Sequence, residues 1–124
     1  MNNTFNDDEQ LYRAVYPPDR MSMFWKHNGT ISDAALKDRN GLSVNRGYYR
    51  SDSDVLKSME NAFSGSVISF TVGDCREEKA IVLYKPTKNI FHSEVHGSYD
   101  NPVLSSSQRK HLIEKAHIIG VLPT

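Results

Sequence analysis

Short strand-forming segments, each stopped by proline, glycine or asparagine, alternate along this chain with two well-marked helix starts. An alternation of this kind is typical of domains in which helices pack against an antiparallel sheet. The length of 124 residues fits one domain with a modest hydrophobic core. We therefore predict a small single-domain α+β protein with about five mainly antiparallel strands and two or three helices.

The expected strands are recognised by their β-branched and aromatic residues. They cover residues 11–16, 42–44, 67–72, 80–84 and 90–96. The segment 80–84, Ala-Ile-Val-Leu-Tyr, is apolar on both faces, which predicts a central place in the sheet. Residues 1–9 are polar and acidic, and we expect them to form a disordered lead-in to a single domain over residues 10–124.

Two serines mark the starts of the longer helices. Ser51 stands three residues before an acidic side chain, and Ser105 stands three residues before Gln108, as in a capping box. The first helix is expected near residues 53–64, and the second continues to about residue 117. The apolar face of the first contains Val55, Leu56, Met59, Ala62 and Phe63. Ser32 is expected to begin a third, shorter helix.

Composition narrows the classes of partner and compartment. The chain has 15 basic and 15 acidic residues, without a run of Lys and Arg that would bind nucleic-acid phosphates. Cys75 is the only cysteine, which excludes an internal disulfide framework and a thiolate zinc site. Neither a signal peptide nor a run of roughly 20 apolar residues is visible. We expect a cytoplasmic protein whose partner is a nucleotide or another protein, a second copy of the chain included.

Three ionisable side chains alternate in the segment 92–96, His-Ser-Glu-Val-His. Because residues two apart on a strand point to the same side, His92, Glu94 and His96 are expected to share one face. Imidazole and carboxylate groups placed in this way can act as general acids and bases. His92 and His96 could also hold a divalent metal with ligands from elsewhere in the chain. The alternative is an ordinary solvent-facing strand.

Several other side chains suit ligand or protein binding. Arg13 lies in the first expected strand beside aromatic and apolar residues, where an arginine pairs with a carboxylate or binds an anion. Tyr49 belongs to the segment 46–50, which is rich in tyrosine and arginine and could stack on a nucleotide base or cover the core. Phe24 and Trp25 are expected in the core or, if exposed, in a protein-contact patch.

Tyr12-Arg13, Leu42-Ser43-Val44 and His92-Ser93-Glu94 resemble, in their order along the chain, the arginine, serine and glutamate triad of ADP-ribosyltransferases. The resemblance implies that Arg13 contacts nicotinamide adenine dinucleotide (NAD), that Ser43 orients it and that Glu94 acts on the ribose and the developing cation. Two positions depart from the family pattern. A single serine replaces the serine-threonine-serine motif, and His92 stands where an acid or glutamine is usual. The chain is also short for that fold.

Three functions follow from these observations. The first is an NAD- or nucleotide-acting enzyme, with Glu94, His92 and Ser43 as catalytic residues and with Arg13 and Tyr49 as ligand-binding residues. The second is a non-catalytic protein-interaction module, monomeric or dimeric. The third is a metal-dependent hydrolase built on the polar face of the segment 92–96.

Overall fold

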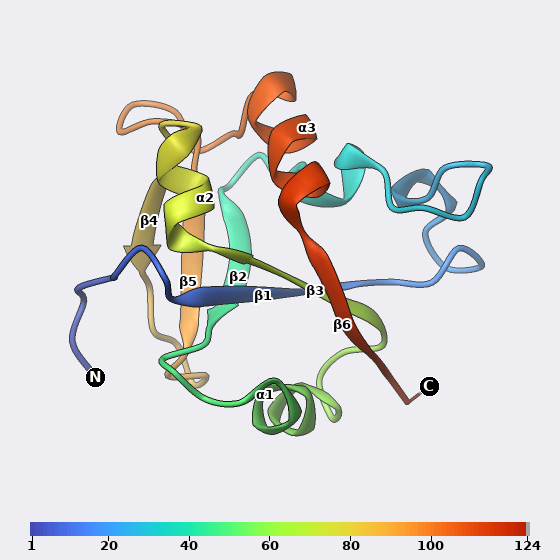
Figure 1. Cartoon of the computed structure of the whole chain (residues 1–124), viewed down its shortest axis with the longest axis horizontal. Coiled ribbons are helices and arrows are strands. Elements are labelled where there is room, and N and C mark those ends of the chain that lie inside the picture. The colour runs from blue at the N-terminus through green and yellow to red at the C-terminus, as the bar shows by residue number, and fades with distance from the viewer. Residues whose placement is uncertain (124) are drawn as a thin grey trace.

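One antiparallel sheet organises the chain, of which the computed structural model describes residues 1–123. Its strands are β1 (Gln10–Val15), β2 (Leu42–Arg46), β3 (Gly65–Thr71), β4 (Ile81–Tyr84), β5 (His92–His96) and β6 (His117–Leu122). They lie side by side in the order β4-β5-β2-β1-β3-β6 (Figure 1). The α-helices are α1 (Asp52–Met59), α2 (Val72–Glu77) and α3 (Ser106–Lys115), and two 3-10 helices are η1 (Ser22–Phe24) and η2 (Asp33–Leu36). The predicted α+β class is confirmed, with one strand more than expected.

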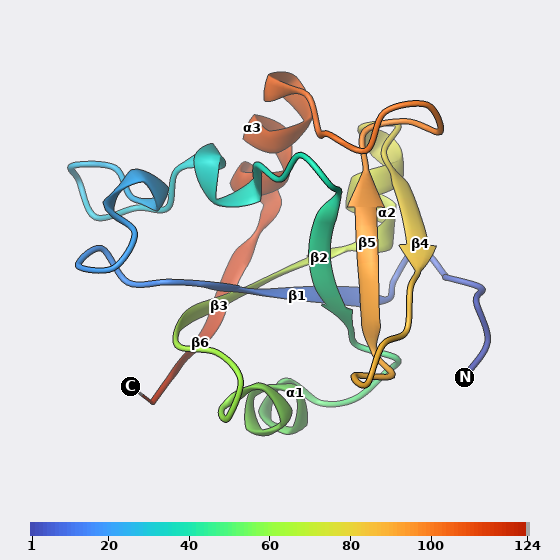
Figure 2. The same cartoon turned by 180° about the vertical axis from the view of Figure 1, so that it is seen from behind.

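The sheet is divided between β1 and β2. These strands pair only through Leu11 with Arg46 and Tyr12 with Asn45, whereas β1 pairs with β3 along its whole length. In Figure 2, β1 runs horizontally, whereas β2, β5 and β4 run vertically and therefore cross its direction. Beyond Tyr12, therefore, β1 and β2 are no longer paired and diverge.

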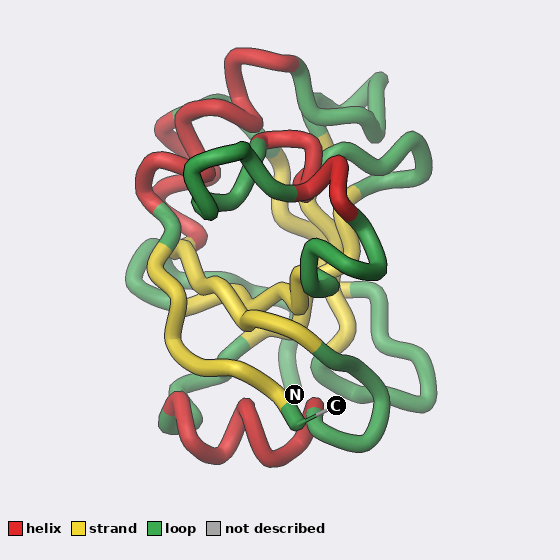
Figure 3. The backbone as a smooth tube through the Cα atoms, turned by 90° about the vertical axis from the view of Figure 1, so that its right-hand side faces the viewer, coloured by secondary structure: helices red, strands yellow, loops and turns green. Residues whose placement is uncertain are grey.

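Helices cover both faces of the sheet, as Figure 3 shows for the tube seen from the side. The larger core lies under α2, α3 and η2 and includes Leu11, Val44, Phe70 and Leu112. A smaller core lies under α1. Among residues 1–123, no helix is long and apolar enough to cross a membrane.

Side-chain caps explain where the α-helices begin. The Ser51 side chain accepts a hydrogen bond from the Asp54 backbone N–H at the start of α1. Ser105 and Gln108 form the predicted reciprocal capping box of α3, while Thr71 and Asp74 form a second one that opens α2. Each cap satisfies backbone N–H groups that the first helical turn leaves without partners.

Helix α1 is shorter than predicted, because it ends at Met59 and residues 60–62 form a turn. Val55 and Met59 are buried and Leu56 packs beside them, as expected from their spacing. Phe63 lies beyond the helix and is exposed, so it does not belong to the buried face.

Met59→Ala should lower the free energy of unfolding by about 2–4 kcal/mol, because a side chain only 2% exposed would leave a cavity beneath α1. The measurement is urea unfolding followed by circular dichroism. Met23→Ala is the matched control, since Met23 is 65% exposed and should change stability by less than about 0.5 kcal/mol. Equal effects of the two substitutions would show that α1 does not pack as described.

One sequence-based prediction about an element was wrong, and two elements were missed. The central place predicted for residues 80–84 is wrong, because β4 is the edge strand beyond β5 and its residues are only half-buried. Strand β6 was not predicted; it follows α3 directly and forms the opposite edge of the sheet. Helix α2 was missed as well, and it places Cys75 in the buried core.

Residues 1–9, expected to be disordered, lie against the sheet. The Phe5 side chain is buried, and the carboxylate of Glu9 is buried as well. The backbone carbonyls of Asn2 and Thr4 accept hydrogen bonds from Arg46 at 2.7 and 3.0 Å. A buried arginine thus holds this segment in place, an interaction that the polar composition of the segment did not indicate.

Candidate functional site

A polar face crosses β2 and β5 on the side of the sheet opposite the larger core. His92, Glu94 and His96 alternate with the buried Ser93 and Val95, so they share one face, as predicted. The register pairs Ser43 with Glu94 across the two strands. It also pairs Asn45 with His92, so four polar side chains lie together on one face of two adjacent strands.

Hydrogen bonds on both sides of the ring hold His92. Its Nδ1 atom lies 2.7 Å from the backbone oxygen of Lys85, and its Nε2 atom lies 3.2 Å from Ser43 Oγ. The Lys85 backbone N–H also donates to the His92 backbone oxygen at 3.1 Å. The imidazole therefore has a defined orientation toward the serine hydroxyl.

Glu94 and His96 form a second pair on the same face, with Oε1 and Nε2 2.8 Å apart. Both side chains are half-buried. Gly41 packs over them with a φ of +100°, and a Cβ atom there would lie 2.6 Å from His96 Nε2 and 3.2 Å from Glu94 Oε1. Glycine is required at this position, because the φ angle is positive and because a side chain would collide with His96.

Arg13 lies where β1 and β2 diverge. Its Nε donates to the backbone oxygen of Ala35 at 3.0 Å, and its Nη1 donates to the backbone oxygen of Ser43 at 2.8 Å. Burial lowers the pKa of the Arg13 guanidinium, while the nearby charge of Asp38 acts in the opposite direction. Arginine remains a cation at neutral pH despite such a shift. The side chain thus bridges β1, η2 and β2.

Arg13, Ser43 and His92 line one small hollow of about 80 Å³ in the space between the diverging strands. Its remaining lining comes from Tyr12, Ala14, Val44, Asn45, Met59, Phe63 and Asn89. A second hollow of about 440 Å³ shares Arg13, Ala14 and Phe63 with the first and extends to Tyr16, Arg20, Met21 and Phe24. The structure therefore brings three of the predicted site residues together, and Glu94 lies beside them as the strand partner of Ser43.

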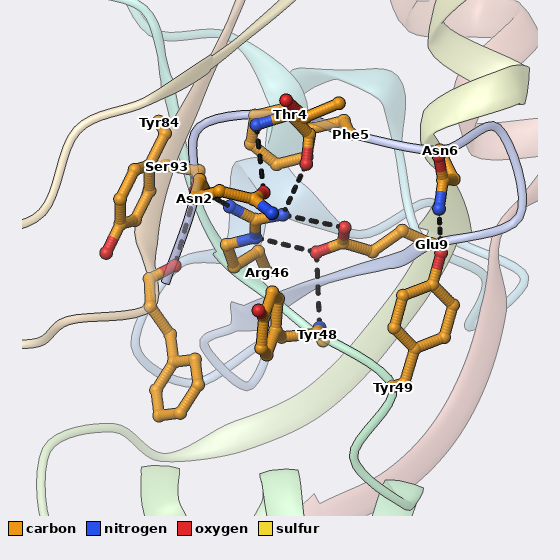
Figure 4. Close-up of polar contacts among 12 residues, drawn as sticks. Asn2, Thr4, Phe5, Asn6, Glu9, Arg46, Tyr48, Tyr49, Tyr84 and Ser93 are labelled. Carbon is orange, nitrogen blue, oxygen red and sulfur yellow. Dashed lines mark hydrogen bonds and ion pairs between the residues drawn. The ribbon is translucent and has the colours of Figure 1, made fainter.

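Tyr49 lies elsewhere, beyond the far end of β2. Its hydroxyl accepts a hydrogen bond from Asn6 Nδ2 at 2.8 Å and donates to Asp8 at 3.1 Å. Beside it, Arg46 is paired with Glu9 through two hydrogen bonds of 2.7 and 2.8 Å (Figure 4). Tyr49 therefore contacts the amino-terminal segment, and the structure does not bring it to the group around Ser43.

The expected metal ligands are hydrogen-bonded within the protein. His92 contacts Lys85 and Ser43, and His96 contacts Glu94. Within residues 1–123 no group of three or more His, Cys, Asp or Glu side chains is placed to hold a metal ion. This arrangement gives a metal-dependent hydrolase no support.

Asn45 and Asn89 are site residues that sequence reasoning missed. Asn89 Nδ2 donates to Asn45 Oδ1 at 2.5 Å, and both side chains line the hollow beside His92. Asn45 follows Ser43 by two positions on the same strand, so the alternation rule applied to the segment 92–96 would have found it. Asn89 comes from a loop and offered no such signal.

No family model matches this chain, and neither a curated protein nor a solved structure is found to be similar to it.

Proposed function

We propose that this chain is an enzyme that acts on a nucleotide, of an ADP-ribosyltransferase-like type with NAD as its ligand. One observation carries the proposal: Arg13, Ser43 and Glu94 stand on β1, β2 and β5, which are neighbours in the sheet. This adjacency of the three strands supports the proposal. Arg13 and Ser43 line one hollow, and Ser43 and Glu94 are direct strand partners.

The size of the second hollow and the lining of both support an extended ligand. The second hollow, at about 440 Å³, falls in the usual range of small-molecule sites, and Arg13 lines both hollows. Arg20 lies 4.4 Å from the ring centre of Tyr16, which offers a cation and an aromatic face together. A dinucleotide would extend from Ser43 past Arg13 toward Arg20, with its phosphates near the two guanidinium groups.

Glu94 would act on the reacting ribose. The bond between the ribose C1 atom and the nicotinamide nitrogen breaks, and its electron pair leaves with nicotinamide. A carboxylate close to C1 stabilises the positive charge that develops there. A water molecule or another acceptor then forms the new bond to C1 and loses its proton to solvent. Ser43 would hold the ribose, while the hydrogen bond from His96 keeps Glu94 in place.

The expected result is that Glu94→Gln slows nicotinamide release from NAD by about 100-fold or more, while NAD still binds, because the substitution removes the charge and keeps the shape. Chromatographic measurement of nicotinamide and calorimetric titration with NAD provide the two readouts. Glu114→Gln is the matched control, since Glu114 is an exposed carboxylate on α3. It should leave both values unchanged.

Binding is tested separately with arginine variants. Arg13→Ala should abolish NAD binding, and Arg20→Ala should weaken it if the ligand extends into the second hollow. Because Arg20 is exposed, Arg20→Ala is expected to fold. It therefore tests binding even if Arg13→Ala, which loses two hydrogen bonds, disturbs the sheet. Absence of binding by the wild-type protein at millimolar NAD would refute the proposal.

Exposed apolar residues on β6 favour a protein-interaction module as the second candidate. Strand β6 is an edge of the sheet, and Ile118 and Val121 on it are 60% and 72% exposed. Trp25, in contrast, packs against the larger core and donates from Nε1 to the Tyr16 carbonyl at 2.7 Å. Sedimentation of the wild type and of Val121→Lys distinguishes self-association through β6 from a monomeric enzyme.

A further inference from the structure

We propose that Ser43 is a nucleophile with His92 as its general base, and that this pair attacks the carbonyl carbon of an ester. This activity goes beyond the proposed action on NAD and does not depend on nucleotide binding. It rests on the hydrogen bonds around the His92 ring, on the exposure of Ser43 and on the position of Asn45.

The hydrogen bond between His92 and Lys85 determines which ring nitrogen carries the proton. A backbone oxygen only accepts hydrogen bonds, so Nδ1, at 2.7 Å from it, is the donor. In the neutral ring Nε2 is then an acceptor, and the Ser43 hydroxyl at 3.2 Å donates to it. The unprotonated nitrogen of His92 thus faces the serine hydroxyl, as a general base must.

The base is held rigidly by backbone rather than by a carboxylate. Lys85 follows the end of β4, and its N–H and carbonyl groups bond to the backbone and the ring of His92 respectively. Nucleophilic sites share a pattern in which a hydroxyl lies within hydrogen-bond reach of a base and a third group orients that base. Ser43, His92 and the Lys85 carbonyl follow this pattern.

The Ser43 hydroxyl is accessible. Ser43 is exposed, whereas Leu42 and Val44 on either side of it are buried, and it lines the hollow together with His92. A substrate can therefore approach the hydroxyl from the open side of the sheet.

Asn45 supplies a hydrogen-bond donor beside the nucleophile. It lies two residues after Ser43 on β2 and is the strand partner of His92. Because its Oδ1 already accepts from Asn89, the side-chain donor Nδ2 remains for a ligand. A donor placed next to the attacked carbonyl can stabilise the oxyanion of the tetrahedral intermediate.

The reaction balances with the residues present. Ser43 Oγ forms a bond to the carbonyl carbon, and its proton moves to His92 Nε2. When the tetrahedral intermediate collapses, the bond from carbon to the leaving oxygen breaks, and His92 returns the proton to that oxygen. An alcohol leaves and an acyl group stays on Ser43, from which water releases it by the same two proton transfers.

Diisopropyl fluorophosphate traps such a serine irreversibly, because Ser43 Oγ bonds to phosphorus, fluoride leaves and the proton passes to His92. Peptide mapping by mass spectrometry should find the label on Ser43 of the wild-type protein and find none at position 43 of Ser43→Ala. His92→Gln should slow labelling by about 100-fold, since glutamine can bond to the hydroxyl but cannot take its proton. His27→Gln, in an exposed turn, is the matched control and should leave the rate unchanged.

Two outcomes would overturn the inference. One is a wild-type protein that carries no label on Ser43, and the other is a labelling rate that His92→Gln leaves unaltered. Thermal unfolding of each variant confirms that it is folded. Because no nucleotide is present, a negative result refutes the nucleophile without affecting the proposed action on NAD, which calorimetry tests independently.

Discussion

Arg46→Ala is expected to destabilise the protein by about 3–5 kcal/mol, because it would leave the buried carboxylate of Glu9 without its partner. The two side chains are 0% and 1% exposed. Removing one member of a buried ion pair is costly, since the remaining charge can neither reach water nor find another cation.

Arg46 also connects several parts of the structure. Its guanidinium lies 4.0 Å from the ring centre of Phe5 and 5.1 Å from that of Tyr84, while its hydrogen bonds reach Asn2 and Thr4. The substitution should therefore remove the positive charge and also detach residues 1–5 from β2. Hydrogen exchange of the backbone amides in this segment would rise in parallel with the loss of stability.

Urea unfolding measures the effect, and two variants serve as controls. Arg76→Ala removes an exposed ion pair with Asp7, in which the side chains are 49% and 75% exposed, and should cost less than about 1 kcal/mol. The double variant Arg46→Met with Glu9→Met removes both charges and should be more stable than Arg46→Ala. If Arg46→Ala cost no more than Arg76→Ala, the pair would not be buried as described.

Gly65→Ala is expected to cost at least about 3 kcal/mol, because a methyl group there meets the backbone of the neighbouring strand. Gly65 begins β3 with a φ of +94°, and a Cβ atom would lie 2.1 Å from the Val15 carbonyl oxygen. Since this neighbour is backbone, it cannot rotate away. Either β1 or β3 therefore has to shift where the two strands meet at Val15 and Gly65.

Gly29→Ala separates the two causes of that loss. Gly29 has a similar φ of +86°, but nothing lies within 4 Å of its Cβ position. Gly29→Ala should therefore lower the free energy of unfolding only by the conformational penalty, about 1–2 kcal/mol. Urea unfolding gives the loss of stability of each variant, and the difference between the two losses is the part due to the clash. Equal losses would contradict the close approach of β1 to Gly65.

Local patterns in the sequence predicted most strands but not their neighbours. Residues 67–72 and 90–96 were identified because alternation and β-branched residues act within a few positions. The place of β4 was predicted wrongly, because a short apolar segment has the same sequence pattern at the edge of a sheet as in its centre. Helix α2 was missed although Thr71 and Asp74 carry the spacing of a capping box.

In the candidate site, too, properties within one strand were predictable, whereas contacts between distant segments were not. Alternation along β5 placed His92, Glu94 and His96 on one face, since that property belongs to a single strand. The hydrogen bond of Arg13 to Ala35 depends on how a distant 3-10 helix packs, and no periodicity reports it. The pairing of Arg46 with Glu9 likewise joins residues far apart in the sequence.

The position of β1 in the middle of the sheet has a consequence for folding. It is synthesised before both of its neighbours in the sheet, β2 and β3, which come later in the chain. The centre of the sheet therefore cannot close until β3 has left the ribosome, and Leu11 and Val15 stay exposed to other chains until then. Contacts between such distant segments also slow refolding of the whole chain. Nascent or truncated forms that end before β3 should consequently depend on chaperones and aggregate without them.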